Sequence, residues 1–183
     1  MIVKLKDVRI AFCQNLFKAG SLNDGEPRFS STFLIPKDDA QVKMVKQTIL
    51  DVAREKWADK AETVLRSLYA DNKVCLKDGD IKSEYEGFTD CMFIAANSKN
   101  APKVFDRDRT ELAETSGRPY AGCYVNASIE IWAQANNFGK RVNAKLRGVQ
   151  FVRDGDAFAG GAPATADEFD DLSDVGDDVG DLV

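Results

Sequence analysis

The stretch Cys123-Tyr-Val-Asn-Ala-Ser-Ile-Glu-Ile-Trp132 decides the fold, because polar and apolar side chains alternate along it with the period of a β-strand. The alternation returns from Arg141 to Arg147, where Val, Ala and Leu fall between cations and an amide. Between the two stretches, Asn136-Asn-Phe-Gly139 is typical of a tight turn. The sequence therefore predicts one long β-hairpin, with an apolar face toward a core and a polar face toward water.

The turn also fixes which residues face each other across the hairpin. With those four residues as the loop, Glu130 faces Lys145 and Ser128 faces Arg147, and the apolar faces of the two arms coincide. Gly148 then interrupts the second arm, which predicts a β-bulge or the close approach of another segment.

The polar face carries two aromatic side chains, Tyr124 and Trp132, together with the cations Arg141, Lys145 and Arg147. Aromatic faces that stack on bases, set among cations that follow a phosphate backbone, are typical of proteins that hold single-stranded nucleic acid without reading its sequence. An ordinary solvated sheet face accounts for the pattern equally well. The remaining sequence has to decide between these two interpretations.

Composition excludes several classes of protein. The chain has 183 residues, 44% hydrophobic and 30% charged, as expected for one globular domain with an additional segment. It has no histidine, which excludes Ser-His-Asp and Cys-His catalysis, and its four cysteines are too scattered to suggest a zinc site. No apolar run approaches membrane-spanning length and the chain begins directly with a strand pattern, so we expect no membrane partner and a cytoplasmic location.

The net charge of −5 hides an uneven distribution. Residues 167–183 hold eight acids and no base, and without them 22 acids remain against 25 Lys and Arg. Residues 99–153 contain ten bases against five acids, so the hairpin region is basic and the C-terminal end is its electrostatic opposite.

Strands and a helical segment precede the hairpin. Ile2 to Phe12 predicts a first strand with a bulge near Asp7, and Phe29 to Ile35 predicts a second. Asp38 is the expected N-cap of a helix that runs to about Trp57, which we assign to the core rather than to base stacking. Further elements expected are a second helix or an extension over 61–68, a turn at Lys77-Asp-Gly-Asp80 and a buried strand from Cys91 to Ala96.

Acidic pairs occur at three places but do not predict a metal site. The Asp-Gly-Asp segments at 78–80 and 154–156 lack the further acids and the distal Glu of a calcium loop. Asp106 and Asp108 could hold Mg²⁺ in a nuclease, yet each stands beside an arginine and no motif supplies a third carboxylate. We therefore expect no metal, no cofactor and no catalytic residue.

The end of the chain differs from the rest. From residue 155 onward Gly, Ala and Thr predict a flexible linker, and the acidic segment after it has too little apolar content to fold alone. The whole pattern predicts a mainly β (α+β) fold, an OB-fold-like five-stranded barrel with a helical insertion over about 38–70 after the second strand, a long late β-hairpin and a disordered acidic C-terminal tail. The domain is expected over 1–154 and the linker and tail over 155–183.

Four short segments carry a family resemblance: Lys77-Asp-Gly-Asp80, Val104-Phe-Asp-Arg107 after Pro102, Tyr120-Ala-Gly-Cys-Tyr-Val-Asn-Ala127 and Gly148-Val-Gln-Phe-Val-Arg-Asp-Gly155. They resemble the tailed-phage single-stranded DNA-binding proteins, once grouped only as a family of unknown function. The resemblance implies an OB fold, sequence-tolerant binding of single-stranded DNA in phage DNA replication or recombination, no enzymatic activity and, for a phage-encoded protein, a location in the host cytoplasm. It also implies that the acidic tail contacts replication or recombination proteins and competes with DNA for the groove.

The expected DNA-binding residues come from the polar hairpin face and the basic region. Tyr124 and Trp132 are expected to stack on bases, with Phe105, Tyr120 and Phe138 as weaker candidates. The expected phosphate contacts are Arg141, Lys145, Arg147, Arg107, Arg109, Lys103, Lys99, Lys140 and Arg118. The expected partner-binding residues of the tail are Asp167, Glu168, Phe169, Asp170, Asp171, Asp174, Asp177, Asp178 and Asp181.

Three other functions stay open at this point. An RNA-binding or strand-annealing module would use the same surface. A Mg²⁺-dependent nuclease would use Asp106 and Asp108, and an adaptor would bind through its tail alone. The sequence also leaves open whether the chain forms a homo-oligomer.

Overall fold

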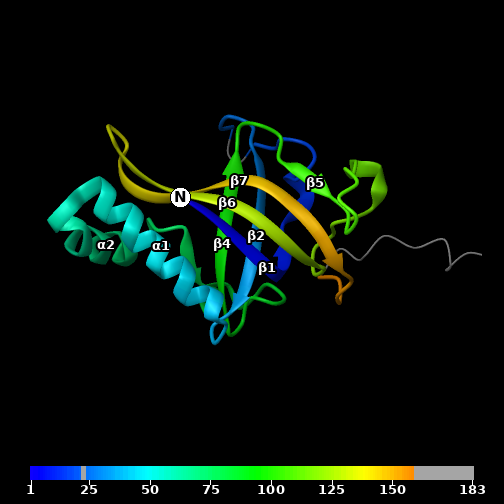
Figure 1. The fold of residues 1–183 in the computed structure, drawn as a ribbon, viewed down its shortest axis with the longest axis horizontal. Helices are drawn as coiled ribbons and strands as arrows, with labels where there is room; N and C mark the ends of the chain where they lie inside the picture. Colours follow the sequence, from blue (N-terminus) through cyan, green and yellow to red (C-terminus); the bar gives the residue numbers. More distant parts are fainter. Residues whose placement is uncertain (22–23, 159–183) are drawn as a thin grey trace, which may run out of the picture.

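The computed structural model describes residues 1–21 and 24–158, which form a seven-stranded sheet with two α-helices at one end (Figure 1). The strand order is β3-β4-β2-β1-β6-β7-β5, and a parallel pairing of β4 with β7 closes the middle five strands into a ring. The predicted mainly β, OB-fold-like architecture is therefore confirmed. The strands are β1 (Ile2–Ala11), β2 (Phe29–Pro36), β3 (Leu76–Asp78), β4 (Cys91–Ser98), β5 (Lys103–Phe105), β6 (Tyr124–Asn136) and β7 (Gly139–Arg153); the helices are α1 (Ala40–Trp57) and α2 (Ala61–Ala70), with 3₁₀ turns at Cys13–Asn15, Ala58–Lys60, Gly79–Lys82 and Glu114–Ser116.

Strands β6 and β7 form the predicted hairpin, and its register next to the turn is confirmed. The loop is shorter than expected, because only 137–138 lie between the last paired residues. Ser128 pairs with Gly148, so its predicted pairing with Arg147 is wrong. A bulge in β7 takes up the extra residue. Gly148 is also a close-approach site, since a Cβ there would lie 2.9 Å from the carbonyl oxygen of Lys103.

The first strand and the first helix follow the sequence closely. The bulge predicted in β1 is confirmed at Asp7, where the pairing with β6 shifts and φ is +50°. Helix α1 begins one residue later than predicted, because Asp39 rather than Asp38 is the N-cap; its carboxylate accepts a hydrogen bond from the Gln41 amide (2.8 Å). Trp57 ends the helix and packs, partly buried, against the core as predicted.

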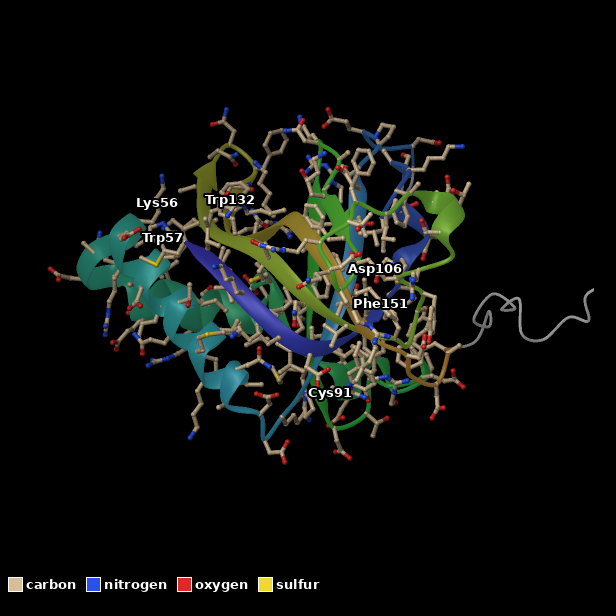
Figure 2. All side chains as sticks on the ribbon, turned by 45° about the vertical axis from the view of Figure 1, so that its right-hand side comes forward. Lys56, Trp57, Cys91, Asp106, Trp132 and Phe151 are labelled. Carbon is tan, nitrogen blue, oxygen red and sulfur yellow. The ribbon has the colours of Figure 1, made fainter. Side chains whose placement is uncertain are left out.

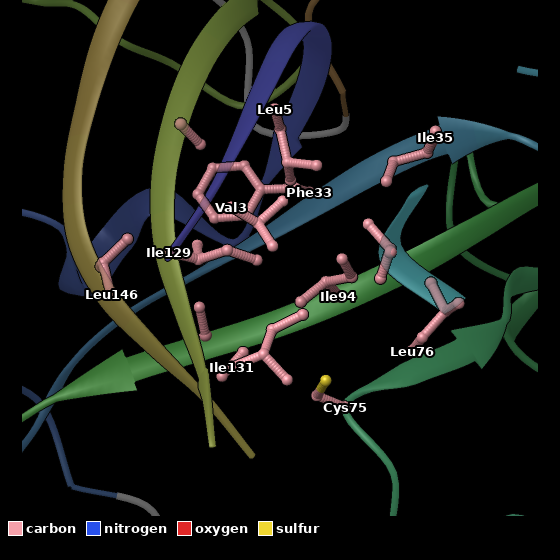
Figure 3. Close-up of a cluster of buried hydrophobic side chains, with 14 of the residues drawn as sticks. Val3, Leu5, Phe33, Ile35, Cys75, Leu76, Ile94, Ile129, Ile131 and Leu146 are labelled. Atoms are coloured by element: carbon pink, nitrogen blue, oxygen red, sulfur yellow. The ribbon is translucent and has the colours of Figure 1, made fainter. Parts of the chain in front are cut away.

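The core fills the ring and continues beneath the helices (Figure 3). The apolar face predicted for the hairpin is buried, with Val125, Ile129 and Ile131 fully enclosed. Figure 3 shows Ile129 and Ile131 beside Phe33 of β2 and Ile94 of β4, so strands far apart in the sequence share one core. Burial of this surface, at roughly 25 cal/mol per Å², is the main term that stabilises the ring.

Residues 155–158, which the sequence assigns to the linker, pack against the domain. The Phe158 amide donates to the Ala121 carbonyl oxygen (3.0 Å), and the Arg9 guanidinium donates to the Asp156 carbonyl oxygen (2.6 Å). Gly87 has φ +82° and lies so close to the Phe158 ring that a Cβ would be 2.4 Å from it.

The tail residues predicted from 167 to 181 lie outside the described residues. In the described ranges, no helix is long and apolar enough to cross a membrane.

The Asp-Gly-Asp turn after β3 is held by a lysine. Lys37 Nζ contacts the carboxylates of Asp78 (2.8 Å) and Asp80. Asp80 also accepts a hydrogen bond from the Asp90 amide (2.9 Å) and thereby ties the turn to the start of β4. Hydrogen bonds from Lys37 lower the pKa of both carboxyls.

The Lys37→Met variant should be less stable than the wild type at neutral pH, and the difference should shrink in acid. Because the folded pKa of Asp78 and Asp80 is lowered, their contribution is present above the unfolded value and is lost as pH falls through the folded value. Urea-unfolding midpoints at pH 7 and pH 3 measure this, with Lys43→Met as the control. An equal difference at both pH values would contradict the assignment.

Candidate nucleic-acid interface

Part of the outer face of β2 and β4 forms the floor of a groove, where the outward side chains are small or polar. Ser30 of β2 pairs with Asn97 of β4, and Thr32 pairs with Ala95. Intervening residues such as Phe33 point into the core. A hollow of about 680 Å³ lies over this floor and reaches the loop that precedes β2.

A second hollow, of about 200 Å³, continues the groove toward β7. It shares Ala95 and Asn97 with the first hollow and adds Lys77, Arg141 and Asn143 to the lining. We call the two hollows together the β2–β4 groove. Its course crosses three strands of the ring, so a bound chain would run from the loop before β2 to the hairpin.

Four cations stand along the groove: Lys77, Lys82, Arg141 and Lys145. Lys145 is placed there because it pairs with Asn97 where the ring closes. Burial lowers the pKa of Lys77, and the charges of Lys82 and Arg141 lower it further, so these three cations act on one another. Among the residues that the structure describes, none of the four has a carboxylate within 4.0 Å. Their charges are therefore available to an anionic ligand.

An aromatic cluster borders the groove at the opposite end from the hairpin. Phe12 and Tyr85 meet edge to face with ring centroids 5.2 Å apart, and the ammonium group of Lys82 lies 5.8 Å from each ring. Phe88 and Phe93 pack beneath them, 5.3 Å apart. Because Tyr85 is 45% exposed, its ring can take a planar ligand.

The loop before β2 adds a rim whose charge is partly neutralised. Arg28 donates a hydrogen bond to the Asn97 side-chain oxygen (2.9 Å) and so reaches over the floor. Glu26 contacts both Arg28 (3.6 Å) and Lys99 (2.9 Å), and the hydrogen bond from Lys99 lowers the pKa of its carboxyl. Lys99, a predicted phosphate contact, is thus paired with an acid.

Comparison with known proteins assigns the family. Residues 1–180 match the family model described as Enterobacter phage Enc34, ssDNA-binding protein. The chain belongs to this family. Protein p50 of Acyrthosiphon pisum secondary endosymbiont phage 1 is 44% identical over an alignment of 176 residues, and the match covers 94% of this chain and 95% of that protein. The resemblance that the sequence motifs indicated is confirmed.

Solved structures share the fold. The single-stranded DNA-binding protein of bacteriophage Enc34 in complex with ssDNA is similar with a TM-score of 0.71 and 27% identity, covering 85% of this chain and 88% of that chain. The same phage protein with a C-terminal truncation has a TM-score of 0.70 and 29% identity, covering 86% of this chain and 88% of that chain. Gp2.5 of bacteriophage T7, a single-stranded DNA-binding protein, has a TM-score of 0.58 and 13% identity, covering 100% of this chain and 98% of that chain. At this identity the likeness is one of fold alone.

The structure brings part of the predicted site to the groove. Arg141 lines it and Lys145 adjoins it, as described above. Trp132 pairs across the hairpin with the groove residue Asn143 and is 43% exposed; Figure 2 shows it near the end of α1. Phe138, 89% exposed, and Lys140 lie at the hairpin tip.

The two predicted stacking residues of β6 are not close together. Tyr124 and Trp132 stand eight residues apart on one strand, about 26 Å at 3.3 Å per residue. The guanidinium of Arg153 covers one face of the Tyr124 ring at 3.5 Å from its centroid. Tyr120 donates its hydroxyl hydrogen bond to Asp154 (2.7 Å) and so holds the segment after β7. Neither tyrosine lines the β2–β4 groove.

The other predicted cations lie away from the groove. Lys103 contacts Glu111 (2.7 Å) and Arg118 contacts Asp106 (2.9 Å), so acids already neutralise both. Figure 2 shows Asp106 and Phe151 to the right of Trp132, toward the end of β7 that lies away from the hairpin turn. The exposed Arg107, Arg109 and Arg147 and the half-buried Phe105 also lie outside the two groove hollows.

The carboxylates considered for a nuclease have structural partners. Asp106 accepts hydrogen bonds from the Arg118 side chain (2.9 Å) and the Arg107 amide (2.8 Å). Asp108 accepts one from the Thr110 amide (2.9 Å), which lowers the pKa of its carboxyl. These contacts hold the loop after β5.

Sequence reasoning missed the half of the groove that lies away from the hairpin. A partial signal was present in β4, where the exposed Ala95 and Asn97 alternate with buried residues. The aromatic cluster left no such signal in the sequence, because Tyr85 meets Phe12 only when a loop far along the chain folds back to it. The groove residues not predicted are Phe12, Arg28, Ser30, Thr32, Lys77, Lys82, Tyr85, Ala95, Asn97 and Asn143.

Proposed function

We propose that this protein binds single-stranded DNA along the β2–β4 groove without reading its sequence. The observation that supports it best is a floor of small or polar side chains beside cations that have no carboxylate partner among the described residues, with exposed aromatic rings at its ends. The family assignment and the Enc34 protein structure in complex with ssDNA support single-stranded DNA as the ligand.

The residues divide into two roles. Lys77, Lys82, Arg141 and Lys145 contact phosphates, because their ammonium and guanidinium groups lack protein carboxylate partners among the described residues. Aromatic faces stack on bases, a contact that duplex pairing hides and that every base can make. The stacking residues we propose are Tyr85 and Phe12 at one end and Trp132 and Phe138 at the other.

We also propose that the protein acts by binding alone, in phage DNA replication or recombination within the host cytoplasm. Protection and presentation of a single strand need no covalent chemistry. The carboxylates nearest to a nuclease arrangement, Asp106 and Asp108, are engaged in hydrogen bonds.

Replacing Tyr85 or Trp132 by Ala should weaken binding of labelled oligo-dT by about 10- to 100-fold each. Stacking contributes roughly 1–3 kcal/mol per base, and about 1.4 kcal/mol is one factor of ten. Fluorescence anisotropy measures the affinity, with Met44→Ala as a control because Met44 is similarly exposed on α1. Unchanged affinity in either aromatic variant would remove that residue from the site.

Charge reversal at Lys145 should weaken binding of all DNA sequences alike and flatten its salt dependence. Each lost phosphate contact should reduce the slope of log affinity against log salt by about 0.7 for single strands. Lys60→Glu between the helices makes the same change in net charge and should leave the slope unaltered. Equal slopes for Lys145→Glu and Lys60→Glu would contradict a phosphate contact by Lys145.

A separate competition experiment tests the choice of nucleic acid. Equal competition by DNA and RNA oligonucleotides of the same sequence would show that the groove does not select DNA.

The acidic tail, we propose, recruits partner proteins and competes with DNA for the groove. The last described residue, Phe158, supports this because it packs on the aromatic cluster that borders the groove. The tail therefore starts beside the proposed site, and its eight acids oppose the groove cations in charge.

Deleting residues 162–183 should tighten oligo-dT binding, most strongly at low salt. Attraction between charges is screened over about 10 Å at 0.1 M salt, so added salt should reduce the effect of the tail. Anisotropy titrations of the full chain and the shortened chain at 0.02 M and 0.3 M salt measure this. Identical affinities at the lower salt concentration would exclude competition by the tail.

A further inference from the structure

A third hollow, of about 570 Å³, opens between α1, α2 and β3, outside the β2–β4 groove floor. Its lining is mainly apolar, with Leu50 of α1, Leu65 and Tyr69 of α2, Leu76 of β3 and Met92 of β4. Tyr69 is 41% exposed and Leu50 and Met92 are partly exposed, so apolar surface remains uncovered. We call this hollow the helix pocket.

The rim of the helix pocket is cationic and joins the DNA groove. Lys46 stands on the α1 side and Lys77 on the β3 side, with Asp78 as the one acid in the lining. Asn72, Val74 and Lys77 line both this pocket and the second hollow of the groove. An anionic peptide lying in the groove can therefore continue into the helix pocket without leaving the cationic surface.

The chain itself carries a peptide of matching chemistry. The segment Asp167-Glu-Phe-Asp-Asp-Leu172 places two large apolar side chains among four acids. A tail that only adds charge has no use for these apolar residues. Docked in the helix pocket, they would leave water while neighbouring carboxylates stay at the cationic rim.

We propose that Phe169 and Leu172 of the chain's own tail dock in the helix pocket. Docking there would lay the acidic tail along the β2–β4 groove, because Phe158 packs on the aromatic cluster at one end of the groove and the helix pocket adjoins the other end. Figure 1 shows the helices on the side of the sheet away from the end of β7. The apolar contact would hold the tail in place, and the charges would keep it in the groove. This site goes beyond the proposed function, since docking does not require that the groove bind DNA.

The length of the tail is sufficient for docking within one chain. Leu172 is fourteen positions after Phe158, and a segment of that length can extend up to about 50 Å. A domain of this size has a radius of gyration of about 15 Å and so a diameter of about 40 Å, which the extended segment exceeds. A tethered segment also has an effective concentration in the millimolar range, which favours the chain's own tail over a tail from another copy.

Amide NMR spectra of the ¹⁵N-labelled full chain without DNA test the proposal. Replacing Phe169 and Leu172 together by Ser keeps every charge and should shift the amide signals of helix-pocket residues such as Leu50, Tyr69 and Val74. Tyr69→Glu should shift the amide signals of Phe169 and Leu172, because it places an acid against the docked acidic peptide. The tail signals are the readout here, since loss of the Tyr69 ring shifts its pocket neighbours by itself. Thr63→Glu, an equal charge change at an exposed site on α2, should leave the spectrum of the pocket as in the wild type.

The outcomes separate the alternatives. Pocket signals identical in the wild type and in the Phe169→Ser, Leu172→Ser variant would overturn the proposal. If unlabelled wild-type protein restored the wild-type signals of that labelled variant, the tail would dock on a second copy and docking within one chain would be overturned. Oligo-dT affinity of the Tyr85→Ala and Lys145→Glu variants is measured separately, so failure of tail docking is distinguishable from failure of DNA binding.

Discussion

The structure depends on the closure of the ring between β4 and β7. Asn97 pairs with Lys145 at that seam, and next to it Val74 pairs with Val142, whose amide donates to the Lys73 carbonyl oxygen (3.1 Å). Closure places the basic outer face of the hairpin beside the small side chains of β2 and β4. Without it the floor of the groove and its cations would belong to two unrelated surfaces. A pairing made for the fold thus also assembles the candidate site.

Most of the fold could be predicted because its determinants are local. The alternation of polar and apolar residues along β6 and β7 predicted the hairpin, and the turn residues predicted its register near the loop. The errors lie where a backbone departs from the regular period. The bulge at Gly148 moved the partner of Ser128 by one residue, because the close approach of β5 could not be seen from the hairpin sequence alone. The N-cap moved from Asp38 to Asp39, two adjacent acids of equal capping ability.

Much less of the candidate site could be predicted, because it is made by pairings between distant segments. The sequence identified cations on β7 and an exposed Trp132, since both follow from alternation within one hairpin. It also placed Tyr124 with Trp132, as if residues on one face of a strand were neighbours. In the folded chain Tyr124 lies under Arg153 at the other end of the strand. The aromatic pair beside the groove is Phe12 and Tyr85, separated by more than seventy residues in sequence.

The uneven charge of the chain acquires a physical role in this arrangement. Among the described residues, the four groove cations have no carboxylate within 4.0 Å. Burial lowers the pKa of Lys77, and repulsion from the charges of Lys82 and Arg141 lowers it further. Any anion that binds in the groove relieves the repulsion between these cations, whether it is a phosphate backbone or the acidic tail. In the arrangement that we propose, the phosphates would bring bases that stack on Tyr85, whereas the tail would bring Phe169 and Leu172 to the helix pocket. Competition between the two ligands would then be set by apolar contacts at opposite ends of the groove, with the cations common to both.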